Sequence, residues 1–186
     1  MKTTTKFEKD LTESCALAVE FLRKKDEKYN KLNKREGKDR LYSSEAQFVA
    51  EVYHLLVKKN ECYRMNLFVN YLSPGKEERQ DKVIPDLVFR NGENQKSIVE
   101  VKVPVDHRAN GSPEPMAKER KEIESDYDKL KKYYKDFNSK FLVVAYLGDT
   151  TLKDGTKFPF EDFSKWIHNK CKDIDKVNDK IKVIVC

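Results

Sequence analysis

The sequence predicts an α/β protein in which helices flank a mixed β-sheet. Stretches with helical periodicity alternate along the chain with short apolar runs bounded by turn residues. Three consecutive strand-like runs, two of them forming a hairpin, precede a long charged helix and a further strand, an order that gives a sheet with both antiparallel and parallel neighbours. At 186 residues, the chain is expected to form one domain spanning residues 1–186.

Two helices are expected before the first strand. Residues 4–28 place apolar side chains at three- and four-residue steps, which gives one apolar face. A polar loop is expected at 28–41. A second helix is expected from Ser43 or Ser44 to about Lys59, because Ser44 and Gln47 form a capping-box pattern.

The rest of the chain predicts strands that alternate with helices. The apolar run at 62–72 predicts the first strand, and the turn signal Asn91-Gly92 within 83–105 predicts a hairpin of the second and third strands. The remaining expected elements are a helix at 116–137, a strand buried on both faces at 141–147, a helix at 161–171 and a strand at 181–185.

Charged residues interrupt the apolar runs of the predicted hairpin. If its loop spans residues 91–95, Asp86 and Glu100 lie equally far from the midpoint, Glu93, and face each other across the strand pair. Their Cβ atoms are then about 4.5–5.5 Å apart, and like charges so close repel unless a cation lies between them. Carboxylate oxygens are ligands that Mg²⁺ prefers, and Lys102 lies on the same strand face as Glu100.

The second helix offers a third acid. At about 100° per residue, Glu45 lies near the centre of the apolar face, since all of that face falls within roughly 80° of it. The residues that define this face are Phe48, Val49, Val52, Leu55 and Leu56. A core-facing carboxylate needs a partner, although Glu45 could instead only favour the positive end of its own helix.

The dipeptide Pro85-Asp86, followed by Glu100-Val101-Lys102 on the next strand, resembles the signature of the PD-(D/E)XK nuclease superfamily. Within that superfamily, the chain is most similar in character to the N-terminal nuclease domains of type I restriction motor subunits. The resemblance implies a restriction-endonuclease-like core of order αβββαβ over about residues 43–147. The first helix and the last helix–strand pair would be additions to this core.

The resemblance also implies an activity, the Mg²⁺-dependent hydrolysis of phosphodiester bonds by an endonuclease or exonuclease, with DNA the favoured substrate. Asp86, Glu100 and the carbonyl of Val101 would bind Mg²⁺, for which Mn²⁺ could substitute. Lys102 would position or deprotonate a water molecule or neutralise the phosphorane, and Glu45 would bind a second ion or orient a water. The alternatives are a ribonuclease, or an inactive nuclease-fold module that binds nucleic acid or a partner protein.

Further basic residues are candidates for contacts with nucleic acid. The net charge of +6 permits phosphate-rich partners. His107 and Arg108 lie in a loop directly after the strand that bears Lys102, and Lys118 and Lys121 lie in the first turns of the charged helix. Simple solvent exposure explains each of these side chains as well. Because a lone domain of this size makes a single cut, cleavage of a duplex would need a homodimer or a nicking role, and a partner protein could supply specificity.

Other classes of protein are disfavoured by the sequence. No apolar run reaches the ~18–20 residues needed to span a bilayer, so no membrane partner is expected. The N-terminus lacks the apolar segment of a signal peptide, which favours a cytoplasmic location. The cysteines form no Cys-x-x-Cys pair and are expected to be free thiols rather than zinc ligands; they are Cys15, Cys62, Cys171 and Cys186.

Overall fold

The computed structural model describes residues 5–33, 43–69, 85–92, 95–104, 117–132, 137–148, 159–174 and 181–186. Helices and strands alternate along most of these ranges. In chain order they are α1 (Lys6–Leu32), α2 (Glu45–Lys59), α3 (Glu61–Asn66), β1 (Leu67–Val69), β2 (Leu87–Asn91), β3 (Gln95–Lys102), α4 (Ala117–Lys132), β4 (Ser139–Val144), α5 (Phe160–Ile174) and β5 (Ile181–Val185).

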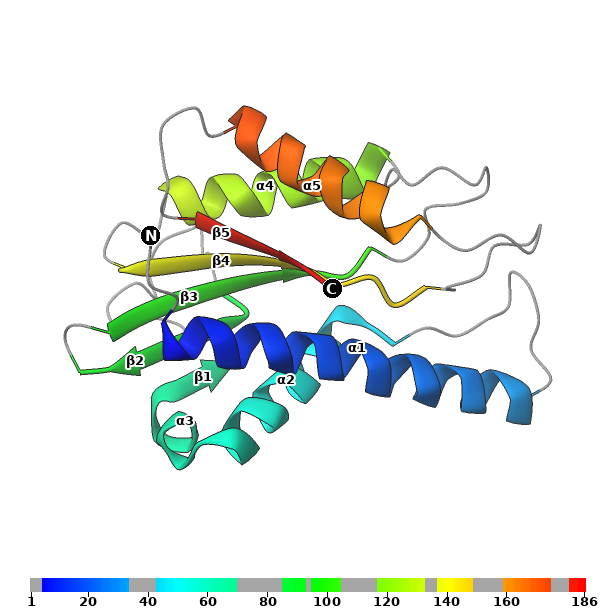
Figure 1. Cartoon of the computed structure of the whole chain (residues 1–186), viewed down its shortest axis with the longest axis horizontal. Coiled ribbons are helices and arrows are strands. Elements are labelled where there is room, and N and C mark those ends of the chain that lie inside the picture. The colour runs from blue at the N-terminus through cyan, green and yellow to red at the C-terminus, as the bar shows by residue number, and fades with distance from the viewer. Residues whose placement is uncertain are drawn as a thin grey trace, which may run out of the picture.

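The described strands form one five-stranded sheet with the order β1-β2-β3-β4-β5. The first three strands pair antiparallel, whereas β3, β4 and β5 pair parallel. Helices α1 and α2 cover one face of the sheet, and α4 and α5 cover the other (Figure 1). The predicted α/β fold with a mixed sheet between helices is therefore confirmed, while the restriction-endonuclease-like core remains a prediction.

The sheet separates two apolar cores. Along β3, Val99 and Val101 pack with the side chains of α1 and α2, whereas Ile98 packs with those of α4 and α5. This alternation follows from the two-residue period of a strand. By the same period, Glu100 and Lys102 lie on the α4 side of the sheet.

The predicted hairpin has the register that the sequence suggested. Leu87 pairs with Val99 and Asn91 pairs with Gln95, so the midpoint of the connection is residue 93. Gly92 begins the turn with a φ of 69°, a left-handed conformation that glycine adopts without strain. Continuing the register one step beyond Leu87 places Asp86 opposite Glu100.

The prediction of a strand at 62–72 is wrong for the first half of this segment. The segment forms the short helix α3 because the Asn60 side chain caps it, with Oδ1 accepting a hydrogen bond of 3.0 Å from the Cys62 N–H. The aromatic side chain that suggested a strand, Tyr63, instead anchors the helix against Phe7 and Phe89. Strand β1 (Leu67–Val69) follows, and residues 70–72 of the predicted strand lie outside the described residues.

The helix before β1 begins as the sequence predicted. Ser44 caps α2 by accepting a hydrogen bond from the Gln47 N–H, and the Gln47 side chain accepts one from the Ser44 N–H. The structure also agrees that the cysteines are free thiols. In the parts of the chain that the structure describes, every helix is too short or too polar to cross a lipid bilayer.

Candidate active site

The predicted acids and lysine meet at one end of the sheet, where β2 begins and β3 ends. Asp86 directly precedes β2, and its Oδ2 atom accepts a hydrogen bond of 2.6 Å from the backbone N–H of Val101. The neighbours of Val101 along β3 are Glu100 and Lys102. This hydrogen bond therefore ties the acid of one strand to the acid and the lysine of the next.

Glu45 reaches this end of the sheet from the first residue of α2. Its Oε2 atom accepts a hydrogen bond of 3.3 Å from the Val103 N–H and lies 3.5 Å from the Lys102 Nζ. Half-buried, with 39% of its side chain exposed, Glu45 lies at the boundary between the core and solvent. The capping box at Ser44 fixes where α2 starts, and so fixes the position of Glu45.

Lys102 is held between two acids from opposite sides of the sheet. Besides its contact with Glu45, its Nζ lies 2.8 Å from the Oε2 of Glu122 on α4. The lysine side chain is 18% exposed. Burial lowers the pKa of Lys102, but the hydrogen bond that Lys102 donates to Glu122 and the nearby negative charges outweigh burial, so its pKa is raised and the ammonium form is favoured.

A second cluster of charges lies beside the first on the α4 side of the sheet. Glu100 and Asp126 are both buried, with exposed fractions of 4% and 8%. Lys129 donates a hydrogen bond of 2.5 Å to Asp126. Burial lowers the pKa of Lys129, but Asp126 and the charges of Glu100 and Asp86 raise it overall.

The surroundings of Asp86 disfavour the charged form of its carboxyl group. Burial of its carboxyl group is the largest cause of a pKa raised to about 6. The hydrogen bond from Val101 opposes this shift, whereas the charges of Glu45 and Asp126 add to it. A carboxyl group with such a pKa is partly protonated in mildly acidic solution and would be fully ionised by a nearby cation.

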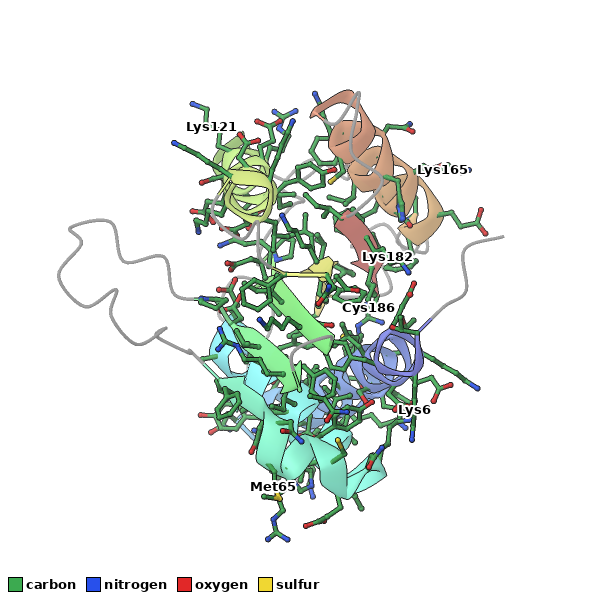
Figure 2. The ribbon with its side chains drawn as sticks, turned by 90° about the vertical axis from the view of Figure 1, so that its left-hand side faces the viewer. Lys6, Met65, Lys121, Lys165, Lys182 and Cys186 are labelled. Atoms are coloured by element: carbon green, nitrogen blue, oxygen red, sulfur yellow. The ribbon has the colours of Figure 1, made fainter. Side chains whose placement is uncertain are left out.

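The structure thus brings Glu45, Asp86, Glu100 and Lys102 to the same end of the sheet. Of the weaker candidates, His107 and Arg108 lie outside the described residues, as does the side chain of Lys118. Lys121 is described: it is exposed on α4 and points away from the sheet into solvent (Figure 2). A contact between Lys121 and a substrate at the clustered acids is therefore not supported.

Sequence reasoning missed the contribution of α4. The apolar stripe of α4 is buried and consists of Ile123, Tyr127 and Leu130. Each polar residue of the site, Glu122, Asp126 and Lys129, immediately precedes one of these three. The polar residues share the spacing of four and three, so the same periodicity could have identified a charged stripe beside the apolar one.

The site has the ligand chemistry of a hard cation but not a complete cage. Among the described residues, no group of three or more His, Cys, Asp or Glu side chains is arranged to hold a metal ion. Carboxylates nevertheless outnumber lysines in this half-buried region, and their oxygens are ligands that Mg²⁺ prefers. Mg²⁺ commonly binds through one or two carboxylates and keeps several waters.

Comparison of the chain with protein-family models, with curated proteins and with solved structures finds no match. Since a fold supports many activities, function has to be inferred from the geometry and charge of the site itself.

Proposed function

We propose that this protein is a metal-dependent nuclease that hydrolyses phosphodiester bonds of nucleic acid, with DNA the favoured substrate. The observation that best supports the proposal is the convergence of one helix acid, two acids at neighbouring strand positions and a lysine at one end of the sheet. Short contacts hold two of these side chains in place. The Asp86 carboxylate lies 2.6 Å from the Val101 nitrogen, and the Lys102 Nζ lies 2.8 Å from the Oε2 of Glu122.

Mg²⁺ is the proposed cofactor, and Mn²⁺ its substitute. Asp86, Glu100 and the carbonyl oxygen of Val101 are the groups proposed to hold the ion. When bound, such an ion polarises a phosphodiester and lowers the pKa of a bound water. The raised pKa of Asp86 supports this proposal, because a carboxyl group surrounded by other acids gains most from a neighbouring positive charge.

Lys102 is proposed to act as a cation rather than as a base. Its raised pKa keeps it protonated in neutral solution, so it cannot readily accept a proton from water. An ammonium held by Glu45 and Glu122 can instead donate hydrogen bonds to a phosphate oxygen and offset the negative charge that develops during hydrolysis.

Glu45 is proposed to orient the attacking water. Its Oε2 atom is already fixed by the Val103 N–H, which leaves its other carboxylate oxygen as a hydrogen-bond acceptor. Because Glu45 also contacts Lys102, the two side chains would hold the water and the phosphate oxygen in a fixed relation.

The experiment is to incubate the purified protein with labelled single- and double-stranded DNA and RNA in Mg²⁺ or Mn²⁺. We expect cleavage to fall at least about 100-fold in Asp86→Asn and in Lys102→Ala, in line with loss of a charge-stabilising group. Lys165→Ala is the matched control, because Lys165 is 68% exposed on α5 and contacts only Asp162 in the described structure. Cleavage that persists in both site variants would overturn the proposal.

A second candidate function is an inactive module that keeps the fold and binds nucleic acid or a partner. Two observations favour it: no three-ligand metal group is found among the described side chains, and Lys102 is already engaged by two acids. Calorimetry of Mg²⁺ and Mn²⁺ binding distinguishes the two candidates. If titration of the wild-type protein with Mg²⁺ and Mn²⁺ releases or absorbs no heat of binding, the inactive module is favoured.

A further inference from the structure

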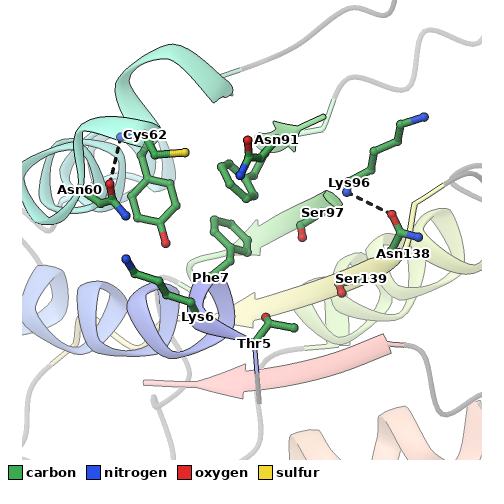
Figure 3. Close-up of a pocket in the computed structure, with 12 residues that line it drawn as sticks. Thr5, Lys6, Phe7, Asn60, Cys62, Asn91, Lys96, Ser97, Asn138 and Ser139 are labelled. Carbon is green, nitrogen blue, oxygen red and sulfur yellow. Dashed lines mark hydrogen bonds between the residues drawn. The ribbon is translucent and has the colours of Figure 1, made fainter. Parts of the chain in front are cut away.

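A cavity of about 550 Å³ lies at the end of the sheet opposite the candidate active site. It is bordered by the starts of α1, α3, β3 and β4 (Figure 3). Ser97, near the start of β3, lines this cavity, whereas Lys102 at the end of β3 belongs to the active site. At roughly 3.3 Å per strand residue the two are about 16 Å apart, and they face opposite sides of the sheet.

Two serine hydroxyl groups line the cavity side by side. Ser97 on β3 and Ser139 on β4 are register partners in the parallel pair and point from the same face of the sheet (Figure 3). Ser97 is buried, with an exposed fraction of 7%, yet its hydroxyl group makes no hydrogen bond with any described residue. A buried hydroxyl without a protein partner at the wall of a cavity is an available ligand group.

The charge of the cavity lining is positive. Lys6 lines it, and none of the described lining residues is Asp or Glu. The Lys96 side chain does not add to this charge, because it is next to Ser97 along β3 and projects from the other face of the sheet (Figure 3). The N-terminus of α1 adds partial positive charge, because Thr5 satisfies the Glu8 N–H while the earlier N–H groups of the helix have no intrahelical acceptor. The lining therefore favours an anion.

The amide side chains of the lining are also oriented as donors. The Oδ1 of Asn60 accepts a hydrogen bond from the Cys62 N–H, and the Oδ1 of Asn138 accepts one of 3.1 Å from the Lys96 N–H. Each amide therefore retains its NH₂ group for other acceptors. Together with the hydroxyls and Lys6, these groups suit a ligand rich in acceptor oxygens, such as a phosphate monoester.

The cavity also has an apolar floor that a bare phosphate ion would not use. Phe7 stacks on Phe89 with ring centroids 4.7 Å apart, and Tyr63 packs edge-on against Phe89 at 5.2 Å. All three rings border the cavity. A volume of about 550 Å³ lies within the usual range for small organic ligands, so the phosphate is expected to be attached to a compact ring system.

We propose that this cavity binds a phosphate monoester of the size of a nucleoside monophosphate. The phosphate would contact Ser97 and Ser139 near the N-terminus of α1, where Lys6 adds positive charge, and the attached ring would cover the aromatic floor. The ligand could be a free mononucleotide or the phosphorylated end of a strand. The proposal does not depend on the nuclease function, since the two sites share no residue.

The test is calorimetry with adenosine monophosphate, uridine monophosphate, the corresponding nucleosides, inorganic phosphate and a 5′-phosphorylated tetranucleotide. EDTA and the Asp86→Asn background exclude binding at the candidate active site. The variants are Ser97→Ala, which removes one hydroxyl group without changing the backbone, and Lys6→Ala, which removes the positive charge at the start of α1. Lys165→Ala on α5 is the matched charge control, and circular dichroism checks that each variant is folded.

We expect the monophosphates to bind at least about tenfold more tightly than the nucleosides and than inorganic phosphate. Ser97→Ala and Lys6→Ala should each weaken monophosphate binding by about tenfold, as for loss of one interaction with a charged group, while Lys165→Ala should change it less than twofold. If the variants weaken binding of the tetranucleotide as much as binding of the mononucleotides, the ligand is identified as the phosphorylated end of a strand. If they weaken binding of the mononucleotides alone, the ligand is identified as a free nucleotide. Absent binding at millimolar ligand, or unchanged affinity in both variants, would overturn the proposal.

Discussion

The carboxylate of Asp86 accepts a 2.6 Å hydrogen bond from the backbone N–H of Val101. The backbone ladder between β2 and β3 ends at the pair Leu87 and Val99, two residues before Val101. The Asp86 side chain therefore continues the connection between the strands where their backbones no longer pair. The bond positions Glu100 and Lys102, and it places an acid where burial and other acids raise its pKa.

The raised pKa of Asp86 predicts a pH dependence of stability. In the folded protein the pKa is about 6, compared with 3.8 for an unperturbed carboxyl group, so the folded state binds the proton more tightly. The associated stability is present below about pH 4 and is lost as the pH rises through about 6, a difference on the order of 2–3 kcal/mol.

Asp86→Asn removes this titration while keeping an acceptor for Val101. In EDTA, the variant should match the wild type near pH 4 and be more stable near pH 7.5. Urea unfolding at several pH values measures the difference. If the free energies of unfolding of the wild type and the variant change with pH in parallel, the raised pKa of Asp86 is contradicted.

Addition of Mg²⁺ should stabilise the wild-type protein at neutral pH. For a dissociation constant of about 1 mM, 10 mM Mg²⁺ adds about 1.4 kcal/mol to the free energy of unfolding, or about 3–5 °C in Tm. Asp86→Asn and Glu100→Gln should abolish the shift. The control is NaCl at matched ionic strength, and an equal Tm in Mg²⁺ and NaCl would speak against a metal site.

Glu122 should control the protonation of Lys102. Because the hydrogen bond that Lys102 donates to Glu122 is the largest cause that raises the lysine pKa, Glu122→Gln should lower that pKa. NMR titration of the lysine side-chain carbons, assigned with Lys102→Arg, measures this change. Glu161→Gln, an exposed substitution on α5, should leave the Lys102 pKa unchanged, and an equal effect of both substitutions would exclude a specific contact.

The cap of α2 should contribute measurably to stability, because it determines where the helix and Glu45 begin. Ser44→Ala is expected to lower the free energy of unfolding by about 1 kcal/mol. Thr12→Ala is the matched control, because the Thr12 hydroxyl donates to the Glu8 carbonyl on an exposed helix surface and is not a cap. Its effect should stay within about 0.5 kcal/mol. If Ser44→Ala and Thr12→Ala lower the free energy of unfolding by similar amounts, the cap does not contribute more to stability than an exposed helix hydroxyl.

The hairpin could be predicted because its register has local causes. A glycine suited to a left-handed turn and the alternation of apolar residues on each side determine which residues face each other, and the pairing of Leu87 with Val99 confirms this. The approach of Glu45 to Lys102 could be expected because helical periodicity directs Glu45 toward the core.

Two parts of the structure could not be predicted in the same way. Helix α3 is too short to show a period, and the aromatic content of its segment suggested a strand, although Asn60 and Tyr63 stabilise a helix. On α4, charged residues are abundant, and which of them face β3 depends on how the helix crosses the sheet. The helical period could place Glu122 in a charged stripe beside the apolar one, but its contact with Lys102 could be known only from the packing.

The strands occupy the sheet in the order in which they occur in the chain. Each new strand can therefore join an edge that already exists, and none has to insert between two earlier ones. During synthesis by a ribosome, the sheet could grow in one direction, starting from the hairpin that bears Asp86 and Glu100. The acids would be in place before β4 and β5 were added, so loss of the final strand would shorten the sheet at its edge without separating these residues.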